Sequence, residues 1–500
     1  MAKYTFSAHG EFLDRETELA ALRRWYETDR EPAVLVLYGR RRTGKSWLFR
    51  EFANGREADI FVCDRRVVLQ QLDGFAGQLE GELGARPQLS SATALFELLA
   101  NLGARGKRLA VIDEFPELYG SRGAPDSELA AVLERSAQTS LKLILCGSQI
   151  STMQKLLRAR GPLHGRTRSM VLAPLTFRQA QDFLRGHQPG DVIQRYAIAG
   201  GMPRYLALFG RKQALKTIVC DEVANPNGAL FQEPQTVLDM ELSETAIHFS
   251  LLSALAGHRD LSHADLLAES KVSDKTAGKY LRVLIDLQLV EAANPIFTAA
   301  TARQRRYRLR DYLMRFWFRF VQPYQQSLEA GLAPAIHYDR NIEPVLNEHV
   351  SWTFEEICRA WTLEQYQEIA DSVGSWWGPA RHDLRRTGER TSEEIDVVGA
   401  HRQRAVVIGE AKWTGQPMGI QVLRDLEQYK IPALEQSGVD AKAAEIVLFS
   451  RSGFAPALQA ESAAQTTKRR IRLVSISEIL SRGNTARTVR PRKVRPKLGK

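Results

Sequence analysis

A loop with the spacing of a phosphate-binding site follows the first apolar run of the chain. It comes directly after Ala33–Tyr38 and directly before the helical pattern WLFREF. Glycines let such a loop turn its backbone N–H groups, and the N-terminus of the next helix, toward negative charge. We expect Lys45 to reach the β- and γ-phosphates of a nucleotide and Ser46 to bind Mg²⁺. The loop residues expected at the nucleotide are Gly39, Arg40, Arg41, Arg42, Thr43, Gly44, Lys45 and Ser46.

Two further apolar runs end in polar residues suited to the same site. Leu109–Ile112 is followed by Asp113 and Glu114, and the run Leu141–Cys146 is followed by Gly-Ser-Gln with Ser148 at its centre. On a strand next to the loop strand, Asp113 would assist Mg²⁺ binding and Glu114 would act as general base for the attacking water. The alternative for Glu114 is a solvated acid at the start of a loop. Ser148 is expected beside the γ-phosphate, as a sensor of its presence.

A second group of charged residues near the C-terminal end has the composition of a metal-dependent hydrolytic site. Asp396 lies in one β-like run, and Glu410 and Lys412 lie in the next, Arg404–Trp413. The two-residue period of a strand puts Glu410 and Lys412 on one face. Two carboxylates and a lysine at one sheet edge can hold Mg²⁺ and position a water for attack on a phosphodiester. The alternative is three surface charges on a domain that only packs.

The elements that must position these residues fall into several blocks. The chain has 500 residues, 44% hydrophobic and 25% charged, which predicts about three globular domains. Alternating β-rich and helical runs predict an α/β multidomain protein, beginning with a P-loop NTPase parallel sheet. The predicted domains are the P-loop domain (1–180), a helical lid (181–245), a winged helix (246–325), a nuclease-like α/β domain (340–480) and a disordered basic tail (481–500).

The middle block resembles a winged helix. Its second helical pattern carries Lys275, Lys279, Tyr280 and Arg282, and the basic run 303–310 would form the wing. Cations at these places suit contacts with DNA phosphates. The alternative is a winged helix that only packs between its neighbours. The aromatic and arginine residues of 311–321 recur at helical spacing, which favours an interdomain core helix over a base-stacking surface.

The net charge of +11 is concentrated in the C-terminal tail. Residues 485–500 contain seven basic residues and no acid. Such a segment cannot pack a core and either binds nucleic-acid phosphates or merely aids solubility. The four cysteines lack metal-site spacing, so we expect small core residues and no cysteine-bound metal. Without a long apolar stretch or a signal-peptide core, we expect a cytoplasmic protein that does not enter membranes.

A series of motifs resembles the archaeal-type ATPases, which belong to the STAND branch of AAA+-like P-loop NTPases. The resemblance covers roughly residues 10–210. It implies that Phe12–Glu16 lie near the adenine and that a turn ending in Pro203 closes over the nucleotide. Arg166 or Arg168 would contact the γ-phosphate in cis or from another subunit, unless they are ordinary surface ion pairs. The motifs are Phe12–Glu16, Asp113–Pro116, Gly147–Ser148, Gly165–Arg168 before Leu172–Leu175, and Gly200–Pro203.

The C-terminal constellation resembles the core of the PD-(D/E)xK, restriction-endonuclease-like nucleases. This resemblance implies a glutamate from an upstream helix, Glu348 or the favoured Glu355, as a further metal ligand beside Asp396 and Glu410. Gln428 or Tyr429 would complete the site. The resulting hypothesis is an ATP-binding and ATP-hydrolysing switch, in which ATP gates a Mg²⁺-dependent nuclease-like domain that acts on DNA. The alternative is an ATP-regulated DNA-binding regulator or scaffold with a non-cleaving C-terminal domain, and either protein could form a homo-oligomer.

Overall fold

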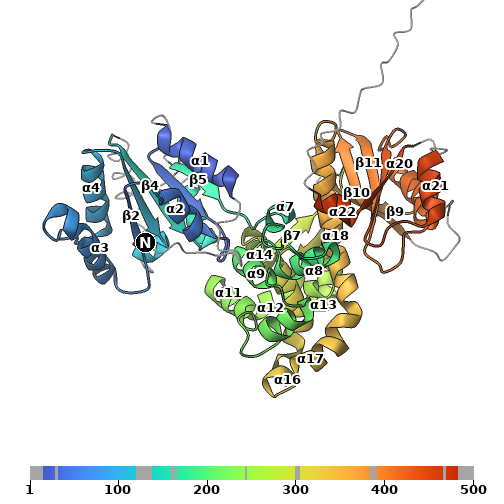
Figure 1. The fold of residues 1–500 in the computed structure, drawn as a ribbon, viewed down its shortest axis with the longest axis horizontal. Coiled ribbons are helices and arrows are strands. Elements are labelled where there is room, and N and C mark those ends of the chain that lie inside the picture. Colours follow the sequence, from blue (N-terminus) through green and yellow to red (C-terminus); the bar gives the residue numbers. More distant parts are fainter. Residues whose placement is uncertain are drawn as a thin grey trace, which may run out of the picture.

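The computed structural model contains two sheet-based lobes connected by a largely helical region (Figure 1). We call them the N-terminal lobe, the central region and the C-terminal lobe. In Figure 1 they are coloured blue to teal, green to yellow, and orange to red. The structure describes residues 15–28, 32–119, 134, 138–158, 164–165, 167–242, 245–298, 304–381, 383–384, 391–464 and 469–481.

The N-terminal lobe is built on a five-stranded parallel sheet with the order β2-β3-β4-β1-β5. Strands β1, β3 and β4 are buried along their whole length, as expected for a parallel sheet covered by helices on both faces. The expected P-loop fold is therefore confirmed. The elements are α1 (Glu16–Glu27), β1 (Val34–Tyr38), α2 (Lys45–Ala53), β2 (Ala58–Val62), α3 (Val68–Leu83), α4 (Ala92–Gly103), β3 (Arg108–Asp113), η1 (Phe115–Leu118), β4 (Leu141–Gly147), α6 (Ile150–Leu157) and β5 (Thr167–Val171).

One detail of the sheet differs from the sequence prediction. We expected the strand that ends at Asp113 to adjoin the strand before the loop, but β4 pairs with both β1 and β3 and lies between them. The chain order of parallel strands does not set their spatial order, because each crossover can pass over a neighbouring strand. Asp113 therefore reaches the loop across the end of β4.

The central region begins with a helical block that follows the first sheet. The block buries aromatic side chains such as Phe183 and Phe209. It contains α7 (Phe177–Ala180), α8 (Pro189–Ala199), α9 (Pro203–Phe209), α10 (Leu215–Ile218), η3 (Val219–Val223) and α11 (Glu233–Glu241).

Three helices and a small antiparallel sheet of order β6-β8-β7 follow, and we call them the middle block. The helix α14 buries one face, including Tyr280 and Leu284, and exposes the other. The elements are α12 (Thr245–Ala256), β6 (Leu261–Ser262), α13 (His263–Ser270), α14 (Asp274–Asp286), β7 (Val290–Ala293) and β8 (Arg306–Leu309).

A run of helices then connects the central region to the C-terminal lobe, and α15 and α18 are its longest members. The aromatic helix α15 packs against α8 and α12, and the 24-residue α18 packs against α8 and against β10. The predicted core role of α15 agrees with this burial, since even Arg315 is 1% exposed. The elements are α15 (Tyr312–Phe320), η5 (Gln322–Tyr324), α16 (Gln325–Glu329), α17 (Pro334–His337), η6 (Tyr338–Ile342) and α18 (Glu343–Tyr366).

The C-terminal lobe has a mixed five-stranded sheet with the order β13-β12-β11-β10-β9. Strands β9, β10 and β11 pair antiparallel, whereas β11, β12 and β13 pair parallel. Helix α18 covers one side of this sheet (Figure 1). The elements are β9 (Ser372–Pro379), β10 (Ser392–His401), β11 (Arg404–Lys412), α19 (Ile420–Asp425), η7 (Leu426–Lys430), α20 (Ile431–Gln436), β12 (Glu445–Ser450), α21 (Pro456–Ala464), β13 (Ile471–Ser475) and α22 (Ile476–Leu480).

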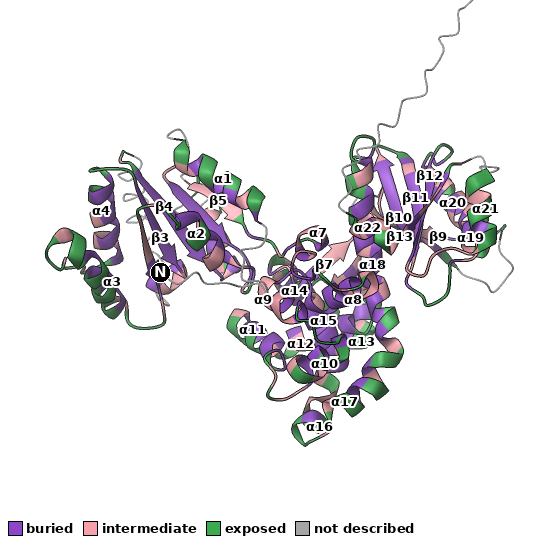
Figure 2. Cartoon of the chain, in the orientation of Figure 1, coloured by how far each residue is buried: buried purple, intermediate pink, exposed green. Residues whose placement is uncertain are grey.

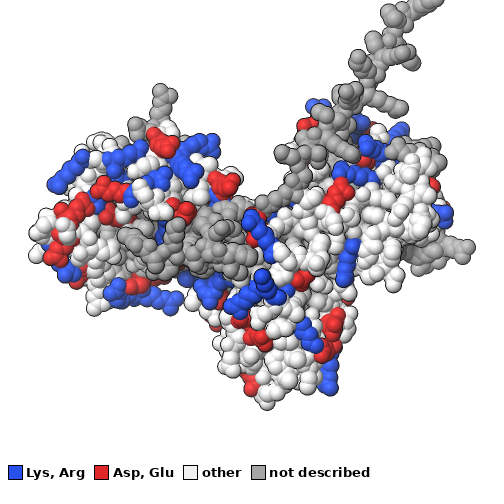
Figure 3. All heavy atoms as spheres, in the orientation of Figure 1, with Lys and Arg blue, Asp and Glu red and all other residues white. Residues whose placement is uncertain are grey.

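Burial and charge follow this architecture. Both large sheets are buried between helices (Figure 2). Cys63, Cys146 and Cys358 are buried, as expected for core residues, whereas Cys220 is only partly buried. On the face drawn in Figure 3, basic and acidic side chains are interspersed over all three regions. Within the described residues, no helix combines the length and the apolar character needed to cross a membrane.

Candidate functional site

The loop after β1 has the backbone of a phosphate-binding loop. Gly44 has φ 91°, a left-handed conformation that favours glycine, and α2 begins at the next residue. A Cβ atom built on Gly39 would lie 2.3 Å from the carbonyl oxygen of Leu172, so only glycine fits there. Thr43 is fully buried and its hydroxyl donates to the carbonyl oxygen of Arg40 at 2.8 Å. The loop is therefore fixed with its N–H groups and a helix N-terminus at one edge of the sheet.

The loop lysine and serine lie where the sequence predicted. The Nζ atom of Lys45 donates to the carbonyl oxygens of Gly39 and Arg40 at 2.9 and 3.0 Å. Burial lowers the pKa of the Lys45 ammonium. The hydroxyl of Ser46 donates to Oδ2 of Asp113 at 2.9 Å. A hydroxyl beside a carboxylate provides the oxygen ligands that Mg²⁺ prefers, so this pair fits a Mg²⁺ ion directly or through water.

Glu114 is held beside the loop by the end of β4. The Ser148 hydroxyl donates to Oε1 of Glu114 at 2.7 Å, and the Ser148 N–H donates to Oε2 at 3.2 Å. Glu114 has φ 52°, which is uncommon for a residue with a side chain. Both residues line the same cavity of about 310 Å³ as Lys45 and Ser46. The structure thus brings the predicted base and the predicted sensor together with the loop.

The helical block closes this cavity from the opposite side. Pro203 lines it, and a Cβ atom built on Gly44 would lie 3.6 Å from Cγ of Pro203. Glu233 on α11 accepts from Nε of Arg42 at 2.8 Å and from the Tyr205 hydroxyl at 3.1 Å. Sequence reasoning missed Glu233, because nothing in the local pattern of α11 relates it to a loop almost 200 residues earlier.

The first arginine of the loop contacts the central region. Nη2 of Arg40 forms a buried ion pair with Oδ2 of Asp311 at 2.6 Å. The other oxygen of Asp311 accepts from the Met314 N–H at 2.7 Å and caps α15. Arg41 does line the cavity, with its Nε atom 4.0 Å from Glu241. The side chain of Arg40 therefore links the loop to α15 and does not line the cavity, so only its backbone could contact a nucleotide.

Three predicted contacts of the nucleotide site have other outcomes. Arg168 pairs with Leu35 inside β5, three residues before the strand end, and it does not line the cavity. Arg166 and residues 12–14 lie outside the described residues. Arg15 does line the cavity and donates to the Thr43 carbonyl oxygen at 3.0 Å.

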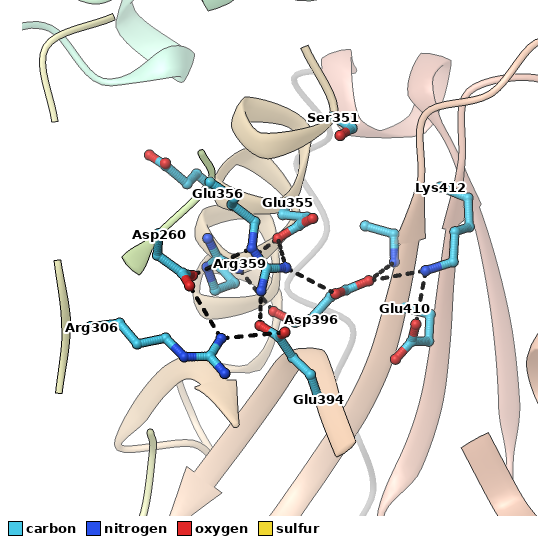
Figure 4. Close-up of polar contacts among 12 residues, drawn as sticks. Asp260, Arg306, Ser351, Glu355, Glu356, Arg359, Glu394, Asp396, Glu410 and Lys412 are labelled. Carbon is cyan, nitrogen blue, oxygen red and sulfur yellow. Dashed lines mark hydrogen bonds and ion pairs between the residues drawn. The ribbon is translucent and has the colours of Figure 1, made fainter. Parts of the chain in front are cut away.

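The C-terminal lobe places its predicted charged residues together. Nζ of Lys412 lies 2.9 Å from Oε2 of Glu410 and 3.4 Å from Oδ2 of Asp396 (Figure 4). Glu410 is 1% exposed and Asp396 is 6% exposed. Oε1 of Glu410 also accepts from Nζ of Lys430 at 2.7 Å. These residues line a polar cavity of about 430 Å³ together with Glu394, Thr391 and Ser392.

Lys430 completes the lining of this cavity. The resemblance to the nucleases implied Gln428 or Tyr429. Residues Leu426–Lys430 form a π-helical turn, whose extra residue per turn affects which side chains face the sheet. Gln428 is exposed.

The third predicted acid, Glu355, is held by an arginine from the middle block. Oε2 of Glu355 lies 3.2 Å from Nη1 of Arg259, which also lies 4.0 Å from Oδ1 of Asp396. Nη2 of Arg259 contacts Glu394. Glu348, the other candidate, pairs with Arg319 at 2.9 Å, away from the cavity. Among the described residues, no group of three acidic, histidine or cysteine residues is arranged to hold a metal ion.

Burial and mutual charge shift the pKa values of these acids in opposite directions. Burial and the charge of Asp396 raise the pKa of Glu355 to about 8. The same two causes raise the pKa of Glu410. Burial also works to raise the pKa of Asp396, but the charges of Lys412 and Lys430 prevail and lower it. The lowered pKa of Asp396 favours its ionised form, the form that binds a divalent cation.

The basic residues of the middle block are exposed on α14 but form ion pairs on β8. Lys275, Lys279 and Arg282 are exposed on α14 at helical spacing, but Tyr280 is buried against His248. The predicted wing differs, because two of its arginines, Arg306 and Arg308, form ion pairs within the protein. Arg306 lies 3.2 Å from Asp260 and stacks on Trp377 of the C-terminal lobe, and Arg308 lies 3.0 Å from Glu291. Residues 299–303 and the tail 482–500 lie outside the described residues.

Comparisons with known proteins support the N-terminal assignment. Residues 12–209 match the family described as an ATPase domain predominantly from Archaea. Residues 317–425 match archaeal and bacterial proteins of unknown function. The chain therefore carries an ATPase domain, which agrees with the predicted resemblance, and a C-terminal region of a family without assigned activity.

Similar whole chains are also found. An uncharacterized protein of Methanocaldococcus jannaschii is 26% identical over 412 residues, 80% of this chain and 87% of that protein. A Walker-type ATPase of Pyrococcus abyssi is 20% identical with a TM-score of 0.48, covering 64% of this chain and 99% of that one. Cdc6p of Pyrobaculum aerophilum is 15% identical with a TM-score of 0.33, covering 70% of this chain and 99% of that one.

Proposed function

We propose that this protein is an ATP-driven switch whose ATPase domain controls a Mg²⁺-dependent phosphodiester-cleaving site in the C-terminal lobe, with DNA as the substrate. One observation carries the proposal: Asp396, Glu410 and Lys412 line one cavity, and a carboxylate oxygen of each acid lies within 3.4 Å of the Lys412 ammonium. An adjacent pair of carboxylates with a lysine suits hydrolysis of a phosphodiester.

The ATPase half uses the residues around the loop. Lys45 neutralises the β- and γ-phosphates, and Ser46 with Asp113 holds Mg²⁺. Glu114 accepts a proton from the attacking water. The Ser148 hydroxyl donates to Glu114 at 2.7 Å, so Ser148 orients that base and faces the place of the γ-phosphate. Arg168 does not line the cavity of its own chain, so it would serve from another subunit in a homo-oligomer.

In the C-terminal half, Asp396 and Glu410 would hold Mg²⁺, which would polarise the phosphate and lower the pKa of a bound water. Lys412 steadies the attacking water or the charge that develops on the phosphate. Lys430 donates to Glu410 at 2.7 Å and keeps this carboxylate oriented. Glu355 would be a further ligand after a movement that separates it from Arg259.

A chain of contacts supports control by ATP. Arg40 of the loop is bound to Asp311, and the next residue, Tyr312, donates its hydroxyl to Glu356 at 2.5 Å. Glu356 lies on α18 next to Glu355, which shares the Arg259 guanidinium with Asp396. A change in the loop on nucleotide binding would thus be transmitted to α18 through two polar contacts in series.

Contact with DNA would use α14 and the tail. Lys275, Lys279 and Arg282 form an exposed basic face on α14, which in a winged helix is the helix that meets DNA. The seven basic residues of 485–500 would add contacts with phosphates.

The second candidate function is a DNA-binding regulator whose C-terminal lobe only docks. The contacts of the predicted wing favour this function, because Arg306 binds Asp260 and Trp377 within the protein and so packs the middle block against the C-terminal lobe. The acids of the C-terminal cavity are also balanced by Arg259, Lys412 and Lys430. In this reading the charges stabilise an interface rather than bind a metal ion.

Plasmid cleavage with Mg²⁺, in the presence of ATP, of ADP or of neither, separates the two candidates. We expect the wild-type protein to cleave with a nucleotide-dependent rate, and Asp396→Asn to lose nearly all cleavage while still binding ATP and DNA. Asp440→Asn is the matched control, because Asp440 is an exposed carboxylate of the same lobe that does not line the cavity. Absence of wild-type cleavage of duplex DNA, single-stranded DNA and RNA under every nucleotide condition would establish the regulator instead.

A further inference from the structure

An arginine from the middle block reaches into the acidic site of the C-terminal lobe. Arg259 belongs to the four-residue loop 257–260 between α12 and β6. Its Nη1 atom lies 3.2 Å from Glu355 and 4.0 Å from Asp396, and its Nη2 atom contacts Glu394. One guanidinium therefore bridges acids from α18 and from β10, two elements of the proposed metal site.

Arg259 is held beside two acids that line the cavity, Glu394 and Asp396. Figure 4 shows Arg306 of β8 and Asp260 on the side of Glu394 that faces away from Lys412. Arg306 lies 3.2 Å from Asp260 and 3.5 Å from Glu394, and its guanidinium stacks on Trp377. The Arg259 side chain is 26% exposed, so part of it already contacts solvent.

The position of this guanidinium conflicts with metal binding at the same carboxylates. A divalent cation needs oxygens of Glu355 and Asp396 at a little over 2 Å, and their shared cation position is the one that Nη1 approaches. Two cations cannot share that position, because they repel each other and compete for the same lone pairs. Arg259 places a positive charge beside these acids, which makes the burial of their ionised forms tolerable.

We propose that Arg259 is a built-in cationic plug, which keeps the C-terminal acidic site closed to divalent cations until a movement of the middle block withdraws it. The proposal rests on the proposed function of that site and adds its regulation. Arg259 is not a catalytic residue in this scheme, since its departure is what permits Glu355 to join Asp396 and Glu410.

The fold supplies a route from the nucleotide site to the plug. Phe249 of α12 packs its ring on Trp317 and Phe318 of α15, with centroids 6.5 and 5.2 Å apart. Asp311 caps the start of α15 and holds Arg40 of the phosphate-binding loop. A shift of α15 that follows nucleotide binding would therefore move α12 and the loop that carries Arg259.

The first test is a calorimetric titration of the full chain with Mn²⁺ in the absence of nucleotide. The heat that disappears in Asp396→Asn is assigned to the C-terminal site. If the plug occupies the site in about nine of ten molecules, Arg259→Gln binds Mn²⁺ about tenfold more tightly than wild type. Two controls should bind Mn²⁺ as tightly as wild type. Arg259→Lys keeps the positive charge, and Arg185→Gln removes an exposed arginine of the helical block that pairs with Asp182. Equal Mn²⁺ affinity in wild type and Arg259→Gln would overturn the proposal.

The second test uses the wild-type chain and is independent of how well the variants fold. Phenylglyoxal modifies accessible guanidinium groups, and peptide mass spectrometry reports the modification of each arginine separately. We expect Mn²⁺ with a non-hydrolysable ATP analogue to accelerate modification of Arg259 several-fold and to leave Arg185 unchanged. An Arg259 rate that is the same with and without these ligands would also overturn the plug.

The two proposals fail in different ways. Tighter Mn²⁺ binding by Arg259→Gln without cleavage in any variant would refute nuclease activity and leave the plug standing. Nucleotide-dependent cleavage by wild type, with identical Mn²⁺ affinity in Arg259→Gln, would refute the plug and leave the nuclease standing.

Discussion

The ion pair between Arg40 and Asp311 is expected to make a large contribution to stability, and Asp311→Asn tests it. The two side chains are 10% and 5% exposed, and Nη2 of Arg40 lies 2.6 Å from Oδ2 of Asp311. Removal of one partner leaves a buried charge, at a cost of about 3 kcal/mol or more. Asparagine remains a good N-cap, so the cap of α15 on the Met314 N–H is kept and the loss isolates the charge.

That free energy can be measured as a melting temperature. A loss of about 3 kcal/mol lowers the Tm of a cooperative unit of 150–250 residues by roughly 6–12 °C, which scanning calorimetry resolves easily. The double variant Arg40→Gln/Asp311→Asn restores a neutral pair and should recover about 1–3 kcal/mol of the summed losses. The control is Asp182→Asn, which removes the partner of the exposed Arg185 and should cost less than about 1 kcal/mol. A Tm for Asp311→Asn as high as that of the control would refute the idea that the loop is anchored on α15.

Three further outcomes are expected. Lys45→Ala should weaken ATP binding by about tenfold or more, because a charge-assisted contact is lost, as a fluorescent-nucleotide titration would report. Glu114→Gln should bind ATP normally and turn over at least about 100-fold more slowly, and a normal rate would contradict its role as base. Deletion of residues 485–500 should flatten the plot of log K against log salt by about 0.9 per lost duplex contact, and an unchanged slope would exclude the tail from binding.

The nucleotide site was predictable because its chemistry is encoded locally. The glycines, Lys45 and Ser46 lie within one loop, and Asp113 and Glu114 end a strand that its apolar run identifies. The spatial order of the strands was not predictable, since β4 lies between β1 and β3. The side-chain role of Arg40 was likewise hidden, because its partner Asp311 lies 271 residues away in the chain.

The C-terminal site shows the same division. Strand periodicity puts Glu410 and Lys412 on one face, Asp396 lies in the preceding strand, and the structure places the Lys412 ammonium within hydrogen-bonding distance of both acids. Lys430 was missed, because the resemblance pointed to Gln428 or Tyr429 and nothing in the sequence shows the π-helical turn that ends at Lys430. Arg259 could not be found from its own surroundings, since a short polar loop gives no sign that it docks on a sheet in another part of the chain.

A buried histidine on α18 predicts how stability depends on pH. His349 is fully buried and packs against the rings of Phe316 and Trp352. Burial, together with the charges of Arg315 and Arg319, lowers the pKa of His349 well below its usual value. In the unfolded chain this pKa returns to about 6.5, so below that pH the unfolded state binds a proton that the folded state does not.

The sign of the effect follows from that difference in bound protons. Stability is unaffected by His349 above about pH 7 and falls as the pH drops below about 6.5, by up to about 1.4 kcal/mol per pH unit. His349→Phe removes this contribution, so its Tm should decline less steeply than that of wild type between about pH 6.5 and 5. A difference in Tm that is the same at every pH does not affect the test, because the test compares how steeply Tm falls with pH. The exposed His258, replaced in the same way, gives the matched control. Parallel Tm curves for wild type and His349→Phe would mean that the buried imidazole accepts a proton in the folded protein, contrary to its surroundings of aromatic rings and arginines.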